Sequence, residues 1–464
     1  MSDALATSSA TRLAEAIRSK EVSSRELLDM YIDRIERLDP PINAVVTLDV
    51  ERARAAADNA DAQLARGDEV GPLHGLPVTI KDAIETEGIR STGGAIELKD
   101  HVPATDAPAV ARLKRAGAIV FGKTNLPRWS GDMQSFNELF GTTNNPWNVE
   151  RVPGGSSGGA AAAVACGFTS FELGTDIGGS VRIPAHFCGV SSLKPSYGVV
   201  PQRGYLDHVG GGIIDPDINV FGPIVRDPDD LELLLGVLAG PEPEREVAWR
   251  LELPEPLGNA LADYRVGVWF DDPACRVLNE YVSMLRGTAD RIADAGAKID
   301  DAHPHVEMAE QISVFGQLIM AAIAQSLPAE FVDAAGTHLA WLNAQDHRAQ
   351  LRTRWAEWFT EYDVLLCPVV PTTAFAHDQN ADIVARTIDI DGVTRGHLDL
   401  TGWTGLIGVV GLPSAVVPIG RTTEGLPVGM QIVSPYLHDR RSVRVAQLVR
   451  DVVGGYEPPP GFAP

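Results

Sequence analysis

The sequence predicts an α/β fold with a central, mixed but largely parallel twisted sheet that helices cover on both faces. A short apolar strand is predicted at 76–80, a helix at 107–116 and the next strand at 118–122. A strand, helix, strand order of this kind is typical of parallel sheets with helices packed on their faces. The same order returns at 265–270, 279–295 and 297–299.

Helical patterns fill the N-terminal segment 8–66, and we expect residues 1–70 to form an outer helical layer. Ser23 and Glu26 have the spacing of a capping box at the start of one helix. Another helix is predicted over 51–65. We interpret these helices as packed outside the core and assign them no chemistry.

The rest of the chain favours a single domain over residues 1–464. Residues 71–240 contain the glycine-rich motifs and are the predicted catalytic core, and we expect a substrate-specificity cap within the largely helical segment 300–400. The Pro- and Glu-rich connector 241–256 could mark a boundary, but strand patterns lie on both sides of it. Later elements are predicted as strands at 362–367, 415–419 and 429–433, a helix at 442–453 and a frayed tail at 457–464.

The composition excludes several kinds of partner. The 464 residues carry a formal net charge of −23, and the sequence pI is about 4.8. Nucleic acids and anionic membranes are bound by basic surfaces, so we expect neither as a partner. The N-terminus lacks the pattern of a signal peptide, and no run of about 18 apolar residues could span a membrane. We therefore expect a cytoplasmic protein.

The cysteines and histidines indicate neither disulfides nor metal chemistry. Cys166, Cys188, Cys275 and Cys367 are scattered without a CxxC pair, as expected for buried thiols in a reducing compartment. The eleven histidines are dispersed as well. We expect no metal site.

Two glycine-flanked serine clusters dominate the middle of the chain. They lie at 154–159 and 178–180, on either side of a small-residue segment that is predicted to be a tightly packed helix. Glycine at this density is used where the backbone turns sharply or approaches a ligand closely. Serines between such glycines supply a hydroxyl nucleophile beside bare backbone N–H groups, which is what acyl transfer requires.

Other interpretations of these clusters fit less well. Residues 154–158 match the G-x-S-x-G nucleophile elbow, but an elbow follows a buried strand, and the polar, proline-broken segment 144–153 precedes this one. Neither cluster continues into the Gly-Lys-Ser/Thr of a phosphate-binding loop. Flexible Gly/Ser loops would not explain two clusters with Asp176, Arg182 and Lys194 close by.

The region 153–195 resembles the signature of the amidase-signature family, which reads GGSSGG and then GTDIGGS. The similarity extends upstream through GLPVTIKD at 75–82 and FGKTN at 121–125, and downstream through GLPS at 411–414 and GLPVGMQ at 425–431. It therefore covers nearly the whole chain. This resemblance implies the amidase-signature fold and amide hydrolysis without a cofactor.

The resemblance implies a Ser–Ser–Lys triad in which Ser180 is the nucleophile, Ser156 the bridging serine and Lys81 the base. It also implies a cis peptide bond between Gly155 and Ser156. A serine hydroxyl needs a base to remove its proton. A lysine can serve only when it is neutral, which requires burial or a nearby positive charge to lower its pKa. Lys81 follows an apolar strand, where its amine can be desolvated.

By the same resemblance, the backbone N–H groups of Ile177, Gly178, Gly179 and Ser180 would form the oxyanion hole. Asp176 and Arg182 would hold that loop, although Arg182 could instead bind a substrate carboxylate. Ser157 would support Ser156, and Ser130 aligns with a position that touches substrate in some members. One departure is visible at 126–129, where the family often places Glu and this chain reads LPRW, which puts the nearby pocket wall in doubt.

Three functions follow as expectations. The first is an amidase that hydrolyses a carboxylic amide of a small molecule through an acyl-enzyme on Ser180. The alternative is the glutaminase subunit of a tRNA-dependent amidotransferase, in which Thr and Gln usually stand where this chain has Ile177 and Ile183. The second alternative is a non-catalytic binding protein on the same fold. A homodimer is compatible with the sequence, which names neither the amide nor the oligomeric state.

Overall fold

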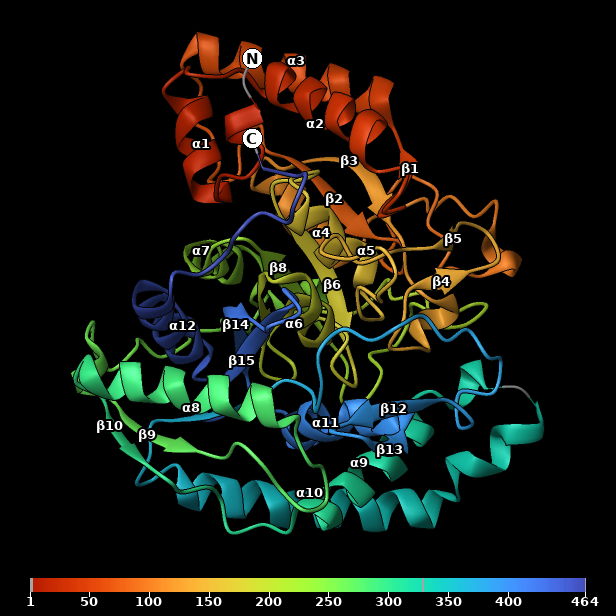
Figure 1. Cartoon of the computed structure of the whole chain (residues 1–464). Coiled ribbons are helices and arrows are strands. Elements are labelled where there is room, and N and C mark those ends of the chain that lie inside the picture. Colours follow the sequence, from red (N-terminus) through yellow and green to blue (C-terminus); the bar gives the residue numbers. More distant parts are fainter. Residues whose placement is uncertain (1–2, 328, 464) are drawn as a thin grey trace.

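The computed structural model describes residues 3–327 and 329–463 and builds them around one large sheet (Figure 1). Eight strands of the described chain form this sheet in the order β10-β9-β11-β15-β14-β7-β8-β6. In chain order they are β6 (Glu172–Asp176), β7 (Ser191–Lys194), β8 (Val220–Val225), β9 (Arg265–Val268), β10 (Lys298–Asp300), β11 (Val364–Pro368), β14 (Ser414–Arg421) and β15 (Pro427–Val433).

The sheet is mixed, as predicted, but it is not largely parallel. β9 pairs in parallel with β10 and β11, whereas the remaining neighbours in the sheet pair antiparallel. A parallel pair arises where a helix returns the chain to the same end of the sheet, as α8 (Asn279–Asp294) does between β9 and β10. β14 and β15 are joined by a tight turn instead, which makes them antiparallel. The mixed sheet is confirmed, and only its predicted parallel majority was wrong. That part of the prediction extended the strand, helix, strand order of two segments to the whole sheet.

A smaller sheet and three helices form the N-terminal layer at the top of Figure 1. β2 (Pro77–Lys81), α4 (Pro108–Arg115) and β3 (Ile119–Thr124) give the predicted parallel unit. The outer helices are α1 (Ala10–Arg18), α2 (Ser24–Leu38) and α3 (Val50–Arg66), and the capping box of Ser23 and Glu26 is present. β1 (Val45–Leu48) pairs antiparallel with β3 and interrupts the segment predicted as helical.

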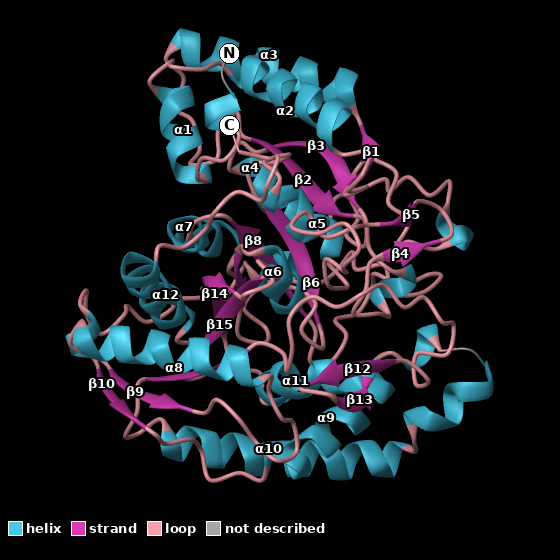
Figure 2. Cartoon of the chain, viewed as in Figure 1, coloured by secondary structure: helices cyan, strands magenta, loops and turns pink. Residues whose placement is uncertain are grey.

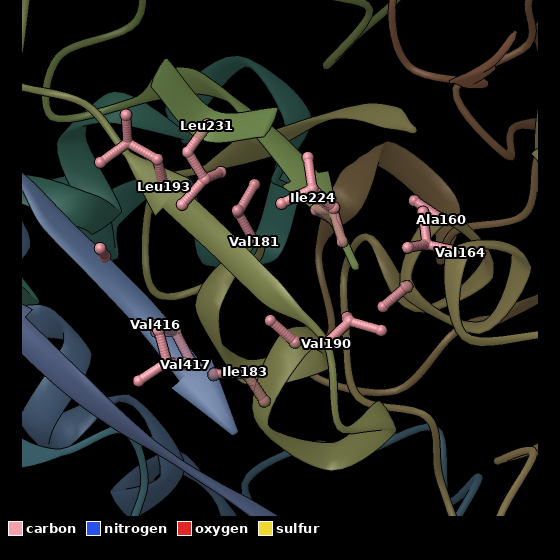
Figure 3. Close-up of a cluster of buried hydrophobic side chains, with 14 of the residues drawn as sticks. Ala160, Val164, Val181, Ile183, Val190, Leu193, Ile224, Leu231, Val416 and Val417 are labelled. Atoms are coloured by element: carbon pink, nitrogen blue, oxygen red, sulfur yellow. The ribbon is translucent and has the colours of Figure 1, made fainter. Parts of the chain in front are cut away.

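Helices flank the large sheet. α6 (Arg182–Cys188) contacts the central strands β15, β14 and β7, whereas α5 (Gly158–Ala165) contacts β8 and β6 at one end of the sheet. α7 (Pro228–Leu238) contacts β7 and β8, and α12 (Asp439–Val453) contacts β14 and β15. Figure 3 shows small and branched side chains of α5, α6, β7, β8, α7 and β14 meeting in the core. All eight residues of α5 are buried, because Gly and Ala let neighbouring strands approach its backbone. The four cysteines are free and buried, as predicted.

The segment after β10 is helical, as predicted, and lies at the bottom of Figures 1 and 2. α9 (Met308–Ala322) packs against α10 (His338–Trp358) and α11 (Gly402–Val409). Short hairpins complete the chain: β4 (Phe136–Asn137) with β5 (Gly141–Thr142), and β12 (Thr387–Ile390) with β13 (Val393–Gly396). Within the described residues, no helix is both long and apolar enough to cross a membrane.

The C-terminal tail is not frayed over its described residues 457–463, and Pro464 lies outside the described residues. The ring of Phe462 packs edge-on against Phe168 with centroids 6.0 Å apart, and Arg34 donates a hydrogen bond to the carbonyl of Phe462. Tyr456 donates to the carbonyl of Ala165 at 2.8 Å. The proline-rich composition predicted a mobile end, but these contacts hold the tail against α2 and against the end of α5. The labels of both termini lie close together in Figure 1.

We expect Trp355→Ala to lower the free energy of unfolding by about 3–5 kcal/mol, because it empties a fully buried site. The indole of Trp355 in α10 donates to Gln311 of α9 at 3.1 Å, so the change also removes a hydrogen bond between the two helices. Urea titration of both proteins measures the difference. Trp249→Ala is the matched control, since this exposed tryptophan should cost less than about 0.5 kcal/mol. Equal losses in the two variants would contradict the packing described for α9 and α10.

Candidate active site

Two glycine-rich loops lead into helices, and each carries one of the predicted serines. The first precedes α5 and contains Ser156; the second joins β6 to α6 and contains Ser180. The peptide bond between Gly155 and Ser156 is cis. A side chain at Gly155 would lie 2.6 Å from the carbonyl oxygen of Asp132, so this close approach of two backbones requires glycine.

The second loop is curled and tied down by α11. Gly179 has φ of 119°, a conformation that residues with a side chain rarely adopt, and a Cβ there would lie 2.6 Å from Thr404 Oγ1. The same Thr404 hydroxyl donates to the carbonyl of Gly178 at 2.7 Å. With that carbonyl held on α11, the loop has little freedom to change its curl.

The two loops are joined to each other beside the serines. The N–H of Ser157 donates to the carbonyl of Ser180 at 3.1 Å. The hydroxyl of Ser157 contacts both the N–H and the carbonyl of Thr175, each at 3.4 Å. Ser157 therefore ties the first loop to the second and to β6. Ser156 is fully buried whereas Ser180 is 9% exposed, so Ser180 is the serine that a small molecule can reach.

Lys81 ends β2 and lies against the first serine loop. Its Nζ atom is 2.6 Å from Ser156 Oγ and 2.7 Å from Thr175 Oγ1, and the whole side chain is buried. Lys81 and Ser156 are 75 residues apart in sequence, and the parallel β2–β3 unit brings the lysine to the serine. Thr175 was not singled out from the sequence, although its place beside Asp176 in the second motif was a usable signal.

Burial lowers the pKa of Lys81 well below its usual range, although the negative charges of Asp176 and Glu172 act in the opposite direction. Glu172 opposes the shift only weakly, because its own burial raises its pKa to about 7. Asp176 remains ionised: burial raises its pKa, but the charge and hydrogen bonds of Arg182 outweigh that effect and lower it. A lysine in these surroundings can be neutral and accept a proton.

Asp176 and Arg182 form a fully buried ion pair behind the second loop. The Nε and Nη2 atoms of Arg182 donate to the two carboxylate oxygens at 3.0 and 2.8 Å, and Nη1 donates to the carbonyl of Thr404 and to Gln431 Oε1, both at 2.9 Å. The guanidinium is thus surrounded by protein acceptors. This arrangement disfavours the alternative in which Arg182 binds a substrate carboxylate.

The N–H groups proposed for the oxyanion hole are not equivalent. Gly179 donates to Asp176 Oδ1 at 2.8 Å, so its N–H is already used within the protein. In the described part of the chain, no other hydrogen bond engages the N–H groups of Ile177, Gly178 and Ser180. These three remain the candidates with a free donor.

Ser130 lies in a left-handed turn at the edge of the site, with φ of 57°. Burial raises the pKa of Tyr205 to about 12, and the neighbouring hydroxyls of Ser130 and Thr175 act in the opposite direction. Tyr205 is thus a neighbour of both Ser130 and the threonine that contacts Lys81. Whether Ser130 touches substrate stays a prediction.

The loop 132–135 supports the first serine loop and was missed in the sequence. The Ser135 hydroxyl donates to the carbonyl of Gly154 at 3.0 Å and accepts from the N–H of Gly158 at 3.0 Å. The side chain of Gln134 makes two hydrogen bonds with the backbone of Asp378, at 2.6 and 3.1 Å. The loop is therefore held between the loop that carries Ser156 and the segment that leads to β12.

A nearly buried ion pair completes this support. Arg386 Nη1 donates to Asp132 Oδ2 at 2.5 Å, and the guanidinium lies over the ring of Phe136, 5.7 Å from its centroid. His397 Nε2 lies 3.7 Å from the other Asp132 oxygen. Asp132 and Arg386 are 254 residues apart, so no local sequence pattern could have paired them.

Comparisons with known proteins agree with this geometry. The sequence profile of the Amidase family matches residues 26–331 and 325–443. The A subunit of glutamyl-tRNA(Gln) amidotransferase from Synechococcus sp. (strain CC9902) is 33% identical, covering 93% of this chain and 94% of that protein. The chain belongs to the amidase-signature family. Its fold matches those of other members in detail.

A substrate-bound 6-aminohexanoate cyclic dimer hydrolase superposes with a TM-score of 0.84 at 26% identity, covering 99% of this chain and 100% of that one. A bacterial aryl acylamidase of the amidase-signature family superposes with a TM-score of 0.83 at 27% identity and 96% coverage of both chains. The predicted amidase-signature fold is confirmed. These relatives act on different substrates by their names, so membership of the family leaves the substrate open.

We expect the rate at which a fluorophosphonate probe modifies Ser180 to rise with pH, because only neutral Lys81 can accept the serine proton. Since the pKa of Lys81 is lowered, the rise should have its midpoint well below the usual lysine value of 10.5. Labelling rates from about pH 6 to about pH 9 measure it, and Lys81→Met should be slower by at least about 100-fold. A flat or falling profile would count against a lysine base.

Asp132→Asn should both destabilise the protein and slow the labelling of Ser180. Removing one partner of a buried pair costs about 3–5 kcal/mol, and the loop that packs on Gly155 loses its anchor. Urea titration and the fluorophosphonate rate give the two readouts. Glu97→Gln is the control, because it breaks the exposed 2.7 Å pair of Glu97 with Arg128, which precedes the loop, and such a pair contributes only about 0–1 kcal/mol. Equal behaviour of both variants would refute the anchoring role.

Proposed function

We propose that this protein hydrolyses a carboxylic amide through an acyl-enzyme on Ser180 and releases ammonia or an amine. The observation that carries the proposal is the 2.6 Å contact between Ser156 and a fully buried Lys81 whose pKa is lowered. A desolvated amine against a serine hydroxyl is a poised base. A buried lysine with a purely structural role would be expected to pair with a carboxylate. The hydrogen-bond partners of Lys81 are instead the hydroxyls of Ser156 and Thr175.

In the proposed mechanism, neutral Lys81 takes the proton of Ser156 as Ser156 takes that of Ser180. The Ser180 oxygen then attacks the amide carbonyl carbon. The free N–H groups of Ile177, Gly178 and Ser180 stabilise the oxyanion, and one such donor contributes about 3–4 kcal/mol in the transition state. Ser156 returns the proton to the leaving amine, and a water molecule, activated by the same relay, hydrolyses the acyl-enzyme.

The second candidate is the glutaminase component of a tRNA-dependent amidotransferase, with glutamine as substrate. The curated relatives favour it, since the amidotransferase proteins from Synechococcus and from Heliobacterium modesticaldum are 33% and 31% identical over nearly the whole chain. Such a protein would work within a complex. The immediate surroundings of the oxyanion loop favour the first candidate, because Phe315, Ile319 and Thr401 present carbon atoms toward Gly178. Glutamine carries an ammonium and a carboxylate, and both would need partners.

The purified chain should turn over a simple non-glutamine amide, and Ser180→Ala should lower kcat by at least about 10⁴-fold without unfolding the protein. Product release from acetamide, an aryl amide, a long-chain amide, a peptide amide and glutamine measures it. Turnover of glutamine alone, or only after partner proteins are added, would favour the amidotransferase component. Failure of Ser180 labelling in the folded protein would favour a non-catalytic binding protein.

A further inference from the structure

The face of α9 that covers the oxyanion loop continues beyond it. Phe315 and Ile319 lie where a Cβ on Gly178 would touch them, at 3.4 and 3.5 Å. Residues three and four apart share one face of a helix, so Phe315, Ile319 and Ala322 form one apolar stripe. Each helical residue advances about 1.5 Å along the axis, which places Ala322 one turn beyond the oxyanion loop.

A cavity of about 240 Å³ lies at the end of this stripe. Ala322 and Gln325 form its helical side, and the loop 207–216 forms the other side. Residues 319–324 are all half-buried, and their side chains are apolar. Of the described residues of α9, Ala322 lines the cavity.

The loop side of the cavity carries two strongly exposed apolar side chains. Ile213 and Ile214 line it and are 76% and 67% exposed, respectively. Gly210 and Gly212 in the same loop have left-handed φ of 80° and 85°. The two glycines therefore shape a turn that presents large apolar side chains at the mouth of a cavity.

The charged groups of the cavity disfavour an anionic ligand. Asp207 and His208 line it, and they are paired with each other at 2.7 Å between Asp207 Oδ1 and His208 Nδ1. Among the described lining residues there is no Lys or Arg that could neutralise a carboxylate. The lining therefore disfavours an anionic acyl group, and its apolar side chains, Ile213, Ile214, Pro216 and Ala322, suit an uncharged apolar one.

The volume of the cavity limits further which kinds of ligand it can hold. A dry apolar cavity of about 150 Å³ binds benzene, so one of about 240 Å³ has room for an aryl ring with a short alkyl chain. We propose that this cavity binds the acyl part of the substrate, and that the substrate is an amide of an uncharged aryl-alkyl or similar apolar acid. The proposal rests on the apolar stripe of α9, the exposed apolar loop at the cavity mouth, the absence of Lys and Arg among the described lining residues, and the cavity volume. This inference rests on the proposed amide hydrolysis at Ser180.

Filling the cavity tests the proposal. With wild-type protein, kcat/KM should be at least tenfold higher for 4-phenylbutyramide than for acetamide, and the anionic succinamate should be the poorest substrate. Ala322→Trp should lower kcat/KM for 4-phenylbutyramide at least tenfold and change that for acetamide less than twofold. Ala321→Trp is the matched control, since Ala321 is half-buried on the same helix but does not line the cavity, and it should change neither substrate by more than twofold. Equal effects of Ala322→Trp on both amides would overturn the assignment.

A second pair of variants avoids the packed helix. Ile213→Asp places a charge at the mouth, and Val209→Asp places one on an exposed apolar residue of the same loop, 63% exposed, that does not line the cavity. We expect the ratio of kcat/KM for 4-phenylbutyramide to that for acetamide to fall at least fivefold in Ile213→Asp and to stay unchanged in Val209→Asp. The same loss in both variants, or in neither, would contradict the proposal.

Binding to Ser180→Ala separates this inference from the proposed function. Calorimetry with 4-phenylbutyramide should detect binding to Ser180→Ala and at least tenfold weaker binding once Ala322→Trp is added. If no amide is hydrolysed but this binding difference is found, the hydrolytic function fails and the cavity assignment stands. If amides are hydrolysed and Ala322→Trp does not alter the binding, the cavity assignment fails and the hydrolytic function stands.

Discussion

The candidate active site depends on keeping the amine of Lys81 desolvated among charged neighbours. Burial favours the neutral amine, and the carboxylates of Asp176 and Glu172 oppose it. Two features keep that opposition small. Arg182 pairs with Asp176 at 2.8 Å, and burial raises the pKa of Glu172 to about 7, so part of its population is uncharged at neutral pH. The buried ion pair is therefore part of what allows a lysine to act as a base, besides holding the loop that follows β6.

The fold forms the candidate site by bringing together short segments that lie far apart in the sequence. β2 ends on Lys81, a cis peptide bond precedes Ser156, and the loop after β6 carries Ser180. Each loop begins a helix of small or fully buried residues, α5 or α6, so the groups proposed to react stand on rigid elements. Loop 132–135 packs against the first serine loop, and Asp378 and Arg386 hold it in place. The geometry of the candidate site therefore depends on contacts from distant parts of the chain.

Short-range sequence patterns predicted the features of the structure that depend on neighbouring residues. The strand that ends at Lys81, the glycine-rich loops and the small-residue helix α5 were all foreseeable, because periodicity and glycine content report them directly. The antiparallel majority of the sheet was not, since pairing depends on which strands meet after long excursions. β6 (ELGTD) and β7 (SSLK) are short, contain several polar residues and carry no strong strand pattern. The Asp132–Arg386 pair and the packing of Phe462 on Phe168 join residues that no spacing rule relates, so only the folded chain could reveal them.

The distribution of charge around Ser180 bears on which amide can enter. Two arginines that support the serine loops are both paired: Arg182 with Asp176 and Arg386 with Asp132. A substrate carboxylate would have to displace an aspartate from a buried guanidinium, which leaves a second charge unpaired. Over the oxyanion loop the neighbours are instead Phe315, Ile319 and the methyl group of Thr401. A zwitterionic substrate would lose hydration without gaining partners there, whereas an apolar acyl group would gain contact area. The same buried ion pairs that stabilise the catalytic loops thus remove the charges that a polar substrate would need.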